Sequence, residues 1–232
     1  MINPLIIGLT GPAGSGKDTV ADILQAETGA GRLAFADALR AEIVSAFGID
    51  PALLTDRASK ERATPQLALS RCNDPRFLFL MGRRFVFLMG RRFPESATLD
   101  ELQEPRSPRH IMQWWGTDYR RHIFSDDWWV RIAHASILRA RERRPSAPIV
   151  ITDVRFANEA AMVRELGGVI WQVSRPGRDA ISAAHESEST GAQFAPKCLI
   201  DNRLDVGYLR AQVREAWHAC TASAQATPEA AS

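Results

Sequence analysis

The sequence predicts an α/β fold in which a parallel sheet is flanked by helices. Short apolar segments at 5–9, 148–152 and 169–173 have the length and the β-branched composition of buried strands. Longer segments between them carry apolar residues three and four positions apart, as amphipathic helices do. A glycine-rich turn joins the first strand directly to the first helix. Strands that alternate with helices in this way are typical of a parallel sheet with helices on its faces.

The glycine-rich turn has the composition of a phosphate-binding loop. It contains Gly11, Gly14, Ser15, Gly16, Lys17, Asp18 and Thr19. Glycines allow successive backbone N–H groups to point inward around a polyphosphate, because a Cβ atom would obstruct them. The helix that begins at Lys17 adds partial positive charge at the same point. We therefore expect the loop to bind a polyphosphate, with Lys17 reaching the outer phosphates.

The residue after the lysine departs from the common form of this motif. A Ser or Thr hydroxyl usually stands there and ligates magnesium. In this chain the position holds Asp18, and the hydroxyl comes one residue later, at Thr19. This spelling resembles that of nucleoside monophosphate kinases more than that of GTPases or motor ATPases. Asp18 either holds the metal through water or caps the start of the helix, and the sequence leaves both readings open.

The elements after the loop lead into a segment with no clear pattern. A helix over 18–28, a strand over 32–35 and a helix over 37–47 are predicted first. Arg40, in the first turn of the last of these, is either a contact for a second substrate or a solvated side chain. From about 50 to 106, five prolines break the chain into short pieces.

The segment 50–106 contains a tandem repeat over 79–93. The heptapeptide Phe-Leu-Met-Gly-Arg-Arg-Phe occurs there twice. Two short copies are too few for a solenoid, so a local duplication explains them. The four arginines of the repeat either clamp phosphates from a lid or lie on the surface.

Further helices and strands follow this segment. Helices are predicted over 108–115, 128–144, 157–166 and 205–220, and strands over 148–152, 169–173 and 198–200. Ser107 caps the first of these helices, and we expect Gly116 to end it. Residues 221–232 are rich in Ala, Thr and Ser and are predicted to form a disordered tail.

A carboxylate, Asp153, stands at the carboxyl end of the strand over 148–152. Ligands of an open parallel sheet gather at this end of the strands. Asp153 is therefore expected to hold magnesium and its water shell across from the phosphate-binding loop. Arg155 follows two residues later and is a candidate to clamp a phosphate.

Composition narrows the class of protein. The 232 residues suffice for one domain over 1–220, with 50–106 as an inserted acceptor or lid region. A net charge of +2 is too small to indicate a nucleic-acid partner. Three scattered cysteines, no leader and no long apolar run predict a cytoplasmic protein that does not bind a membrane. Homodimerisation is left open.

Several short motifs follow one another in a distinctive order. They lie at 11–22, 33–40, 109–118, 129–131, 152–156, Glu159, 173–177, His185 and 201–202. In this order they resemble the phage-type deoxynucleoside monophosphate kinase family. Gln-x-x-Gly-Thr-Asp together with Asp-x-Arg is far more specific than the phosphate-binding loop alone. The middle segment, where the duplication falls, shows no such similarity.

The resemblance implies both a fold and a reaction. The fold is P-loop nucleoside monophosphate kinase-like, with inserted monophosphate-binding and lid segments. The reaction moves the γ-phosphate of ATP to a deoxynucleoside monophosphate. Arg109, Gly116 and Trp129 are implied at the monophosphate site. The matching motifs extend the candidates to Gln113, Thr117 and Asp118 for the acceptor and to Arg175 for ATP.

The residues fit this chemistry independently of the resemblance, since phosphoryl transfer needs positioning and charge neutralisation more than covalent help. Lys17 and the loop amides would hold the donor phosphates. Mg²⁺ would be held, mostly through water, by Asp153, Asp18 and Thr19. Arg109, Arg155, Arg120 and Arg40 are the candidates to contact the acceptor or the transferring phosphate. The alternatives are a kinase of another small acceptor, such as dephospho-coenzyme A, and a P-loop ATPase switch.

Overall fold

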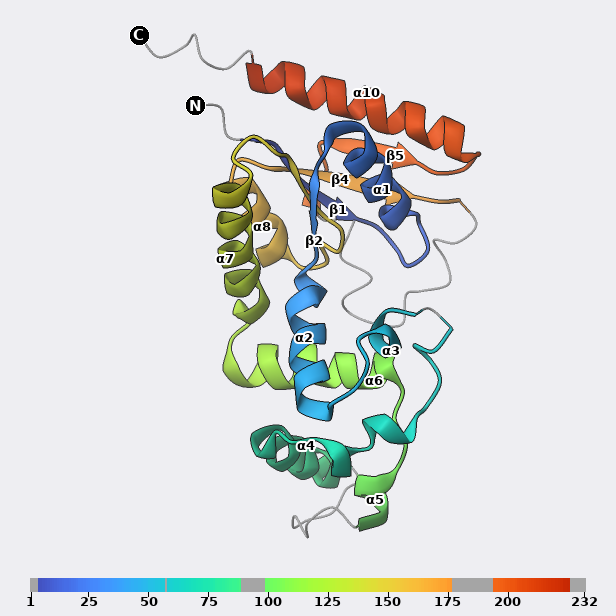
Figure 1. Ribbon diagram of the computed structural model, residues 1–232, viewed down its shortest axis with the longest axis vertical. Coiled ribbons are helices and arrows are strands. Elements are labelled where there is room, and N and C mark those ends of the chain that lie inside the picture. The colour runs from blue at the N-terminus through green and yellow to red at the C-terminus, as the bar shows by residue number, and fades with distance from the viewer. Residues whose placement is uncertain (1–3, 57, 89–98, 177–193, 226–232) are drawn as a thin grey trace. The chain divides into compact units, whose positions relative to one another are not determined.

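The computed structural model describes residues 4–56, 58–88, 99–176 and 194–225 (Figure 1). It divides into two compact units. Unit 1 comprises residues 1–35 and 132–232, and unit 2 comprises residues 36–131. Unit 2 is therefore an insertion in the sequence of unit 1, and it is wider than the 50–106 segment that the sequence analysis marked.

Unit 1 is built on a parallel sheet of five strands, as the sequence predicts. The strands are β1 (Ile6–Thr10), β2 (Gly31–Leu33), β3 (Ile149–Ile151), β4 (Val169–Ser174) and β5 (Cys198–Asp201). Their order is β2-β3-β1-β4-β5, and every neighbouring pair is parallel. β1 is central and fully buried, which explains its continuous run of apolar residues.

Helices cover both faces of this sheet (Figure 1). α1 (Lys17–Thr28) and α10 (Val206–Gln225) pack on one face, where Val20, Leu24, Leu209 and Val213 meet the strands. α8 (Ala157–Glu165) packs on the opposite face. A Cβ on Gly8 would stand 2.8 Å from Ile170 of β4, 2.9 Å from Val154 and 3.4 Å from Val163 of α8. Glycine is therefore required in the middle of this strand.

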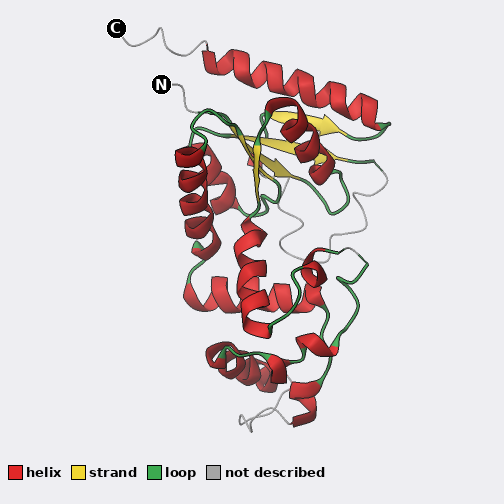
Figure 2. Cartoon of the chain, viewed as in Figure 1, coloured by secondary structure: helices red, strands yellow, loops and turns green. Residues whose placement is uncertain are grey.

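The named elements of unit 2 are helical (Figure 2). They are α2 (Phe35–Phe47), which starts at the last residue of unit 1, α3 (Ala52–Thr55), 3₁₀ turns at Pro65–Leu67 and Leu69–Arg71, α4 (Pro75–Leu88), α5 (Leu99–Gln103), α6 (Pro108–Gln113) and the π-helix η3 (Trp114–Phe124). α7 (Trp128–Arg143) begins in unit 2 and continues into unit 1. The core of unit 2 is aromatic. The ring centres of Phe77 and Trp115 lie 4.5 Å apart, and those of Phe77 and Tyr119 lie 5.2 Å apart.

The prediction that Gly116 ends a helix is wrong. α6 begins as predicted, since Ser107 accepts a hydrogen bond from His110 N and Pro108 is the first helical residue. The chain then passes through Gly116 without a break and continues as a π-helix to Phe124. A Cβ at Gly116 would lie 3.2 Å from the Leu39 side chain, so this glycine allows close packing and does not stop the helix.

Two further differences concern the duplicated segment and the end of the chain. The first copy of the heptapeptide, 79–85, lies within helix α4, and the second, 87–93, falls mostly outside the described residues. α10 runs to Gln225, five residues into the stretch predicted to be a tail. Among the residues that the structure describes, no helix combines the length and hydropathy that a bilayer span needs.

Candidate active site

The glycine-rich turn forms a preshaped loop between β1 and α1. Gly11, Gly14 and Gly16 have φ values of 139°, 80° and 104°, a region that glycine adopts without strain. A Cβ on Gly11 would lie 2.1 Å from the Val173 carbonyl oxygen. The loop therefore depends on its glycines in two ways, through backbone conformation and through close approach to β4.

Lys17 lies folded over this loop. Its Nζ donates hydrogen bonds to the carbonyl oxygens of Gly11, at 2.6 Å, and Pro12, at 2.9 Å. Ser15 is fully buried, and its Oγ is a buried atom that has no hydrogen-bond partner. A buried hydroxyl without a partner is unusual and fits a loop that has a further ligand to receive.

Asp18 is the second residue of α1 and does not cap it. The N-cap is Gly16, with no side-chain hydrogen bond to the helix. The Asp18 carboxylate forms an ion pair with Arg32, and its side chain is 80% exposed. The capping reading of Asp18 is therefore wrong, although its charge still favours the helix N-terminus. Thr19 lies one position further along α1, partly buried.

The carboxyl ends of the strands bring further predicted residues to the edge that carries the loop. Gly8 of β1 is in register with Ile151 of β3, so Asp153 is level with Thr10, one residue before Gly11. Asp153 Oδ1 accepts a hydrogen bond from the backbone N–H of Phe35, at 2.7 Å. Arg175 leaves the end of β4 with an exposed side chain. Asp153 therefore lies at the edge of the sheet predicted for it, and Arg175 lies at the same edge.

Arg155 is held by its backbone. Its N–H donates to Glu159 Oε2 at 2.8 Å, and the same oxygen accepts from Phe156 N at 3.2 Å. Glu159 is only 2% exposed and caps the start of α8. The Arg155 side chain itself is exposed. Glu159 thus fixes the chain just after Asp153.

Asn202 is a residue of this edge to which the sequence analysis gave no role. It follows β5 and is 8% exposed. Its Nδ2 donates to the Ser15 carbonyl oxygen at 2.8 Å, and the same amide nitrogen would lie 2.3 Å from a Cβ on Gly16. Its backbone N–H donates to Ser174 O, also at 2.8 Å. Asn202 therefore links β4, β5 and the loop.

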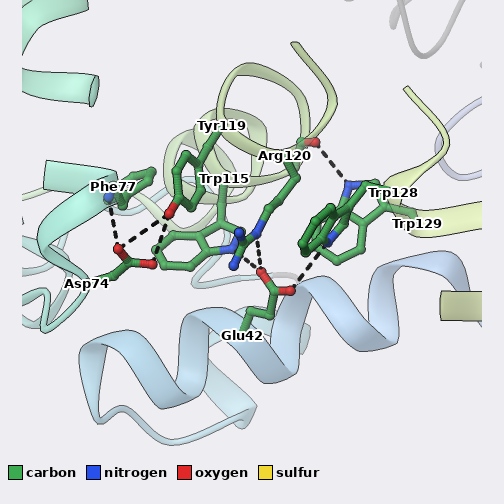
Figure 3. Close-up of polar contacts among 9 residues, drawn as sticks. Glu42, Asp74, Phe77, Trp115, Tyr119, Arg120, Trp128 and Trp129 are labelled. Carbon is green, nitrogen blue, oxygen red and sulfur yellow. Dashed lines mark hydrogen bonds and ion pairs between the residues drawn. The ribbon is translucent and has the colours of Figure 1, made fainter. Parts of the chain in front are cut away.

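Unit 2 contains a separate polar cluster around Arg120 (Figure 3). Arg120 Nε donates to Glu42 Oε2 at 2.7 Å, and the two side chains are 15% and 24% exposed. Glu42 also accepts from Trp115 Nε1 at 2.6 Å and from Trp128 Nε1 at 3.4 Å. Arg120 was predicted from the sequence as a site residue, whereas Glu42 and Trp128 were not. The only sequence signal for Glu42 was a carboxylate on the helix that also carries Arg40.

Tyr119 belongs to the same helix and bonds a second carboxylate (Figure 3). Its hydroxyl donates to Asp74 Oδ2 at 3.1 Å. Burial, reinforced by the neighbouring Asp74 charge, raises the pKa of Tyr119 to about 12. Asp74 Oδ1 in turn accepts from the backbone N–H groups of Arg76 and Phe77, at 2.9 Å each. Tyr119 therefore stays protonated at neutral pH and fixes η3 to the start of α4.

The other acceptor candidates of unit 2 are held in several ways. Arg40 pairs with Asp37 at 2.9 Å while its Nε is buried without a partner, and Arg109 forms an ion pair with Glu61. Trp129 is 4% exposed and donates from Nε1 to the Gly116 carbonyl oxygen at 3.0 Å. Gln113, Thr117 and Asp118 are partly buried at the junction of α6 and η3.

A parallel α/β sheet whose central strand leads through a glycine loop into a helix defines the class of this protein. It is a phosphate-loop fold of the kind that nucleotide-dependent kinases use. A model of the deoxynucleotide monophosphate kinase family matches residues 91–212, more than half of the chain. The chain therefore belongs to that family, and it is a phosphotransferase.

Two viral relatives agree with this assignment. The chain is 29% identical over 185 residues to a putative deoxynucleotide monophosphate kinase of Acanthamoeba polyphaga mimivirus, covering 75% of each. It is 29% identical over 184 residues to the deoxynucleoside-5'-monophosphate kinase of Escherichia phage T5, covering 69% of this chain and 72% of the phage protein. The crystal structure of TT1252 from Thermus thermophilus aligns with 94% of the chain and 97% of its own, with a TM-score of 0.47 and 18% identity.

Proposed function

We propose that the chain transfers the γ-phosphate of ATP to a deoxynucleoside monophosphate, with Mg²⁺, and releases ADP and the deoxynucleoside diphosphate. The observation that carries this proposal is the preshaped loop of unit 1. Its three glycines with positive φ, its lysine and its buried Ser15 hydroxyl stand at one helix N-terminus. Backbone amides in that arrangement suit the charge of a triphosphate.

The proposed contacts for the phosphates of ATP lie in unit 1, at Gly11, Gly14, Ser15, Gly16 and Lys17. Lys17 would exchange its two carbonyl partners for phosphate oxygens, because a charged acceptor makes the stronger hydrogen bond. Arg175, at the carboxyl end of β4, is the candidate contact for the rest of the nucleotide. Small-molecule nucleotides are thus the proposed partners.

Asp153, Thr19 and Asp18 fit a magnesium ion that is bound mostly through water. Within the described ranges, no group of three or more His, Cys, Asp or Glu side chains is placed to hold a metal. Magnesium commonly uses one or two carboxylates together with substrate phosphates, so a single carboxylate at this edge suffices. The ion would neutralise the charge that develops on the transferred phosphate.

The candidate contacts for the acceptor monophosphate lie in unit 2. Arg120, Arg109 and Arg40 supply the positive charge, and Gln113, Gly116, Thr117, Asp118 and Trp129 are the further candidates. Arg155 is the candidate of unit 1 for the transferring phosphate. Arginine is suited to this work because its planar fork binds two phosphate oxygens at once.

The proposal is tested with purified protein, ATP, a panel of deoxynucleoside and ribonucleoside monophosphates, and dephospho-coenzyme A as a further acceptor. Formation of the matching diphosphate is measured with and without Mg²⁺. We expect transfer to at least one deoxynucleoside monophosphate, and almost none when Mg²⁺ is removed. Dephospho-coenzyme A as the only acceptor would overturn the proposal. ATP hydrolysis that is indifferent to monophosphates would instead indicate an ATPase switch.

A further inference from the structure

The Arg120 side chain is anchored through only one of its nitrogens. Its Nε donates to Glu42 Oε2 at 2.7 Å. Within the described part of the chain, this is the one hydrogen bond that its guanidinium makes, and neither Nη atom is a buried atom without a partner. Both Nη groups therefore keep some accessible surface although the side chain is only 15% exposed.

Aromatic rings fix the plane of the same guanidinium (Figure 3). Its central carbon lies 4.5 Å from the ring centre of Trp128 and 4.6 Å from that of Tyr119. Phe124 and Trp115 lie further off, at 5.2 Å and 5.8 Å. Cation–π contacts of this kind hold an arginine in one orientation and remove much of its rotational freedom.

Glu42 is itself held in place. Besides Arg120 it receives the indole N–H groups of Trp115 and Trp128, so three donors converge on one carboxylate. Two of these donors are neutral. The negative charge of Glu42 is thus shared with two neutral donors as well as with Arg120. The Arg120 guanidinium therefore keeps positive charge at its two Nη groups.

We propose that Glu42 is a positioning residue that holds Arg120 so that its two Nη groups bind the phosphate of the acceptor monophosphate end-on. This inference rests on the proposed function and names the residues that would recognise the acceptor phosphate. The ligand chemistry is that of a phosphate monoester dianion, which can offer two of its three terminal oxygens to the two Nη donors. An exposed arginine would have to be ordered on binding, whereas Arg120 is ordered beforehand.

The test compares Glu42→Gln with the wild type. Glutamine preserves the shape of the side chain and one acceptor oxygen but removes the charge that holds Nε. We expect the KM of the best monophosphate to rise at least tenfold, while the KM of ATP changes less than twofold. Arg120→Lys should give a similar rise, since lysine has no fork to offer. In the double variant the two effects should not add, because both act through one contact.

Direct binding separates positioning from a purely structural role. Calorimetry is done without ATP, using the best monophosphate and its parent deoxynucleoside, which lacks the phosphate. Glu42→Gln should lower the affinity for the monophosphate and leave the affinity for the deoxynucleoside unchanged. Equal weakening of both ligands, or a loss of melting temperature with no selective change in binding, would show that Glu42 only supports the fold and would overturn the inference.

A control variant and the wild-type result keep the two proposals apart. Glu104→Gln removes a carboxylate partner of Arg106, which lies in the same unit and has no place in the proposed site, and it should leave the Arg120-dependent selectivity intact. If the wild type transfers phosphate but Glu42→Gln keeps its monophosphate KM, only this inference fails. If the wild type neither binds nor phosphorylates any monophosphate, the proposed function fails.

Discussion

The side-chain amide of Asn202 donates a hydrogen bond to the backbone carbonyl of Ser15, at 2.8 Å. The two residues are 187 positions apart in the sequence, and the contact is buried. The same amide occupies the space that a Cβ on Gly16 would need. The shape of the phosphate-binding loop is therefore set from the end of β5 as well as by its own glycines.

Replacing Asn202 should loosen the loop. Asn202→Ala leaves the buried Ser15 carbonyl without its donor, which costs about 1–3 kcal/mol. We expect a lower melting temperature and a higher KM for ATP, with the KM of the monophosphate little changed. Asn73→Ala, which removes an exposed amide bond to the Ser45 carbonyl, is the matched control and should leave the KM of ATP alone. An unchanged KM for ATP in Asn202→Ala would contradict the role given to this side chain.

Gly16 and Gly48 form a second matched pair. Both have positive φ, 104° and 62°, but only Gly16 has a neighbour where a Cβ would stand. Gly48→Ala should cost about 1–2 kcal/mol of unfolding free energy through backbone strain alone. Gly16→Ala adds the clash with Asn202, so it should cost more and also lower activity. Denaturant unfolding of both variants measures the difference, and equal losses would show that the clash is relieved.

Lys17→Ala should abolish transfer and leave the fold intact. The lysine makes two hydrogen bonds to loop carbonyls, so the fold loses little, whereas the transition state loses a positive charge. Removing one preorganised electrostatic contact of this kind costs about 10²–10³ in kcat. The exposed Lys197 is the control, since Lys197→Ala should keep full activity. A Lys17→Ala protein with more than about a tenth of the wild-type kcat would speak against the donor site.

Asp153 is best tested by a magnesium titration. Asp153→Asn keeps an oxygen for the Phe35 N–H but loses the charge that would hold the ion. We expect the magnesium concentration for half-maximal rate to rise more than the KM of the monophosphate does. If the titration curve stays where it is and that KM rises, Asp153 belongs to the acceptor site. Asp153→Ala, which also removes the bond to Phe35, should in addition lower the melting temperature.

Local sequence patterns predicted the sheet and the donor loop well. β1, β3 and β4 are short buried apolar runs, and the sequence around Lys17 identifies its loop without further help. Pattern also indicated that Asp153 would stand at the edge that carries this loop, because parallel strands end on the same side. These features depend on residues that are close together in the chain.

The features that the sequence did not reveal depend on distant contacts. Glu42 meets Arg120 78 positions later, and Asn202 reaches back to Ser15. The helix through Gly116 was missed because glycine normally indicates a helix end. Its reason lies in the Leu39 side chain, which leaves no room for a larger residue there without adjustment.

The position of β1 in the sheet has a consequence for how the chain folds. Both of its neighbours come much later in the sequence, at 149–151 and 169–172. Unit 2, by contrast, is continuous over 36–131 and rich in helices, whose contacts form quickly. We expect unit 2 to fold before β1 pairs with β3 and β4, since closing the long loop between these strands is slow. The phosphate-binding loop is thus synthesised before the strands that shape it. It acquires its final conformation only after those strands have paired.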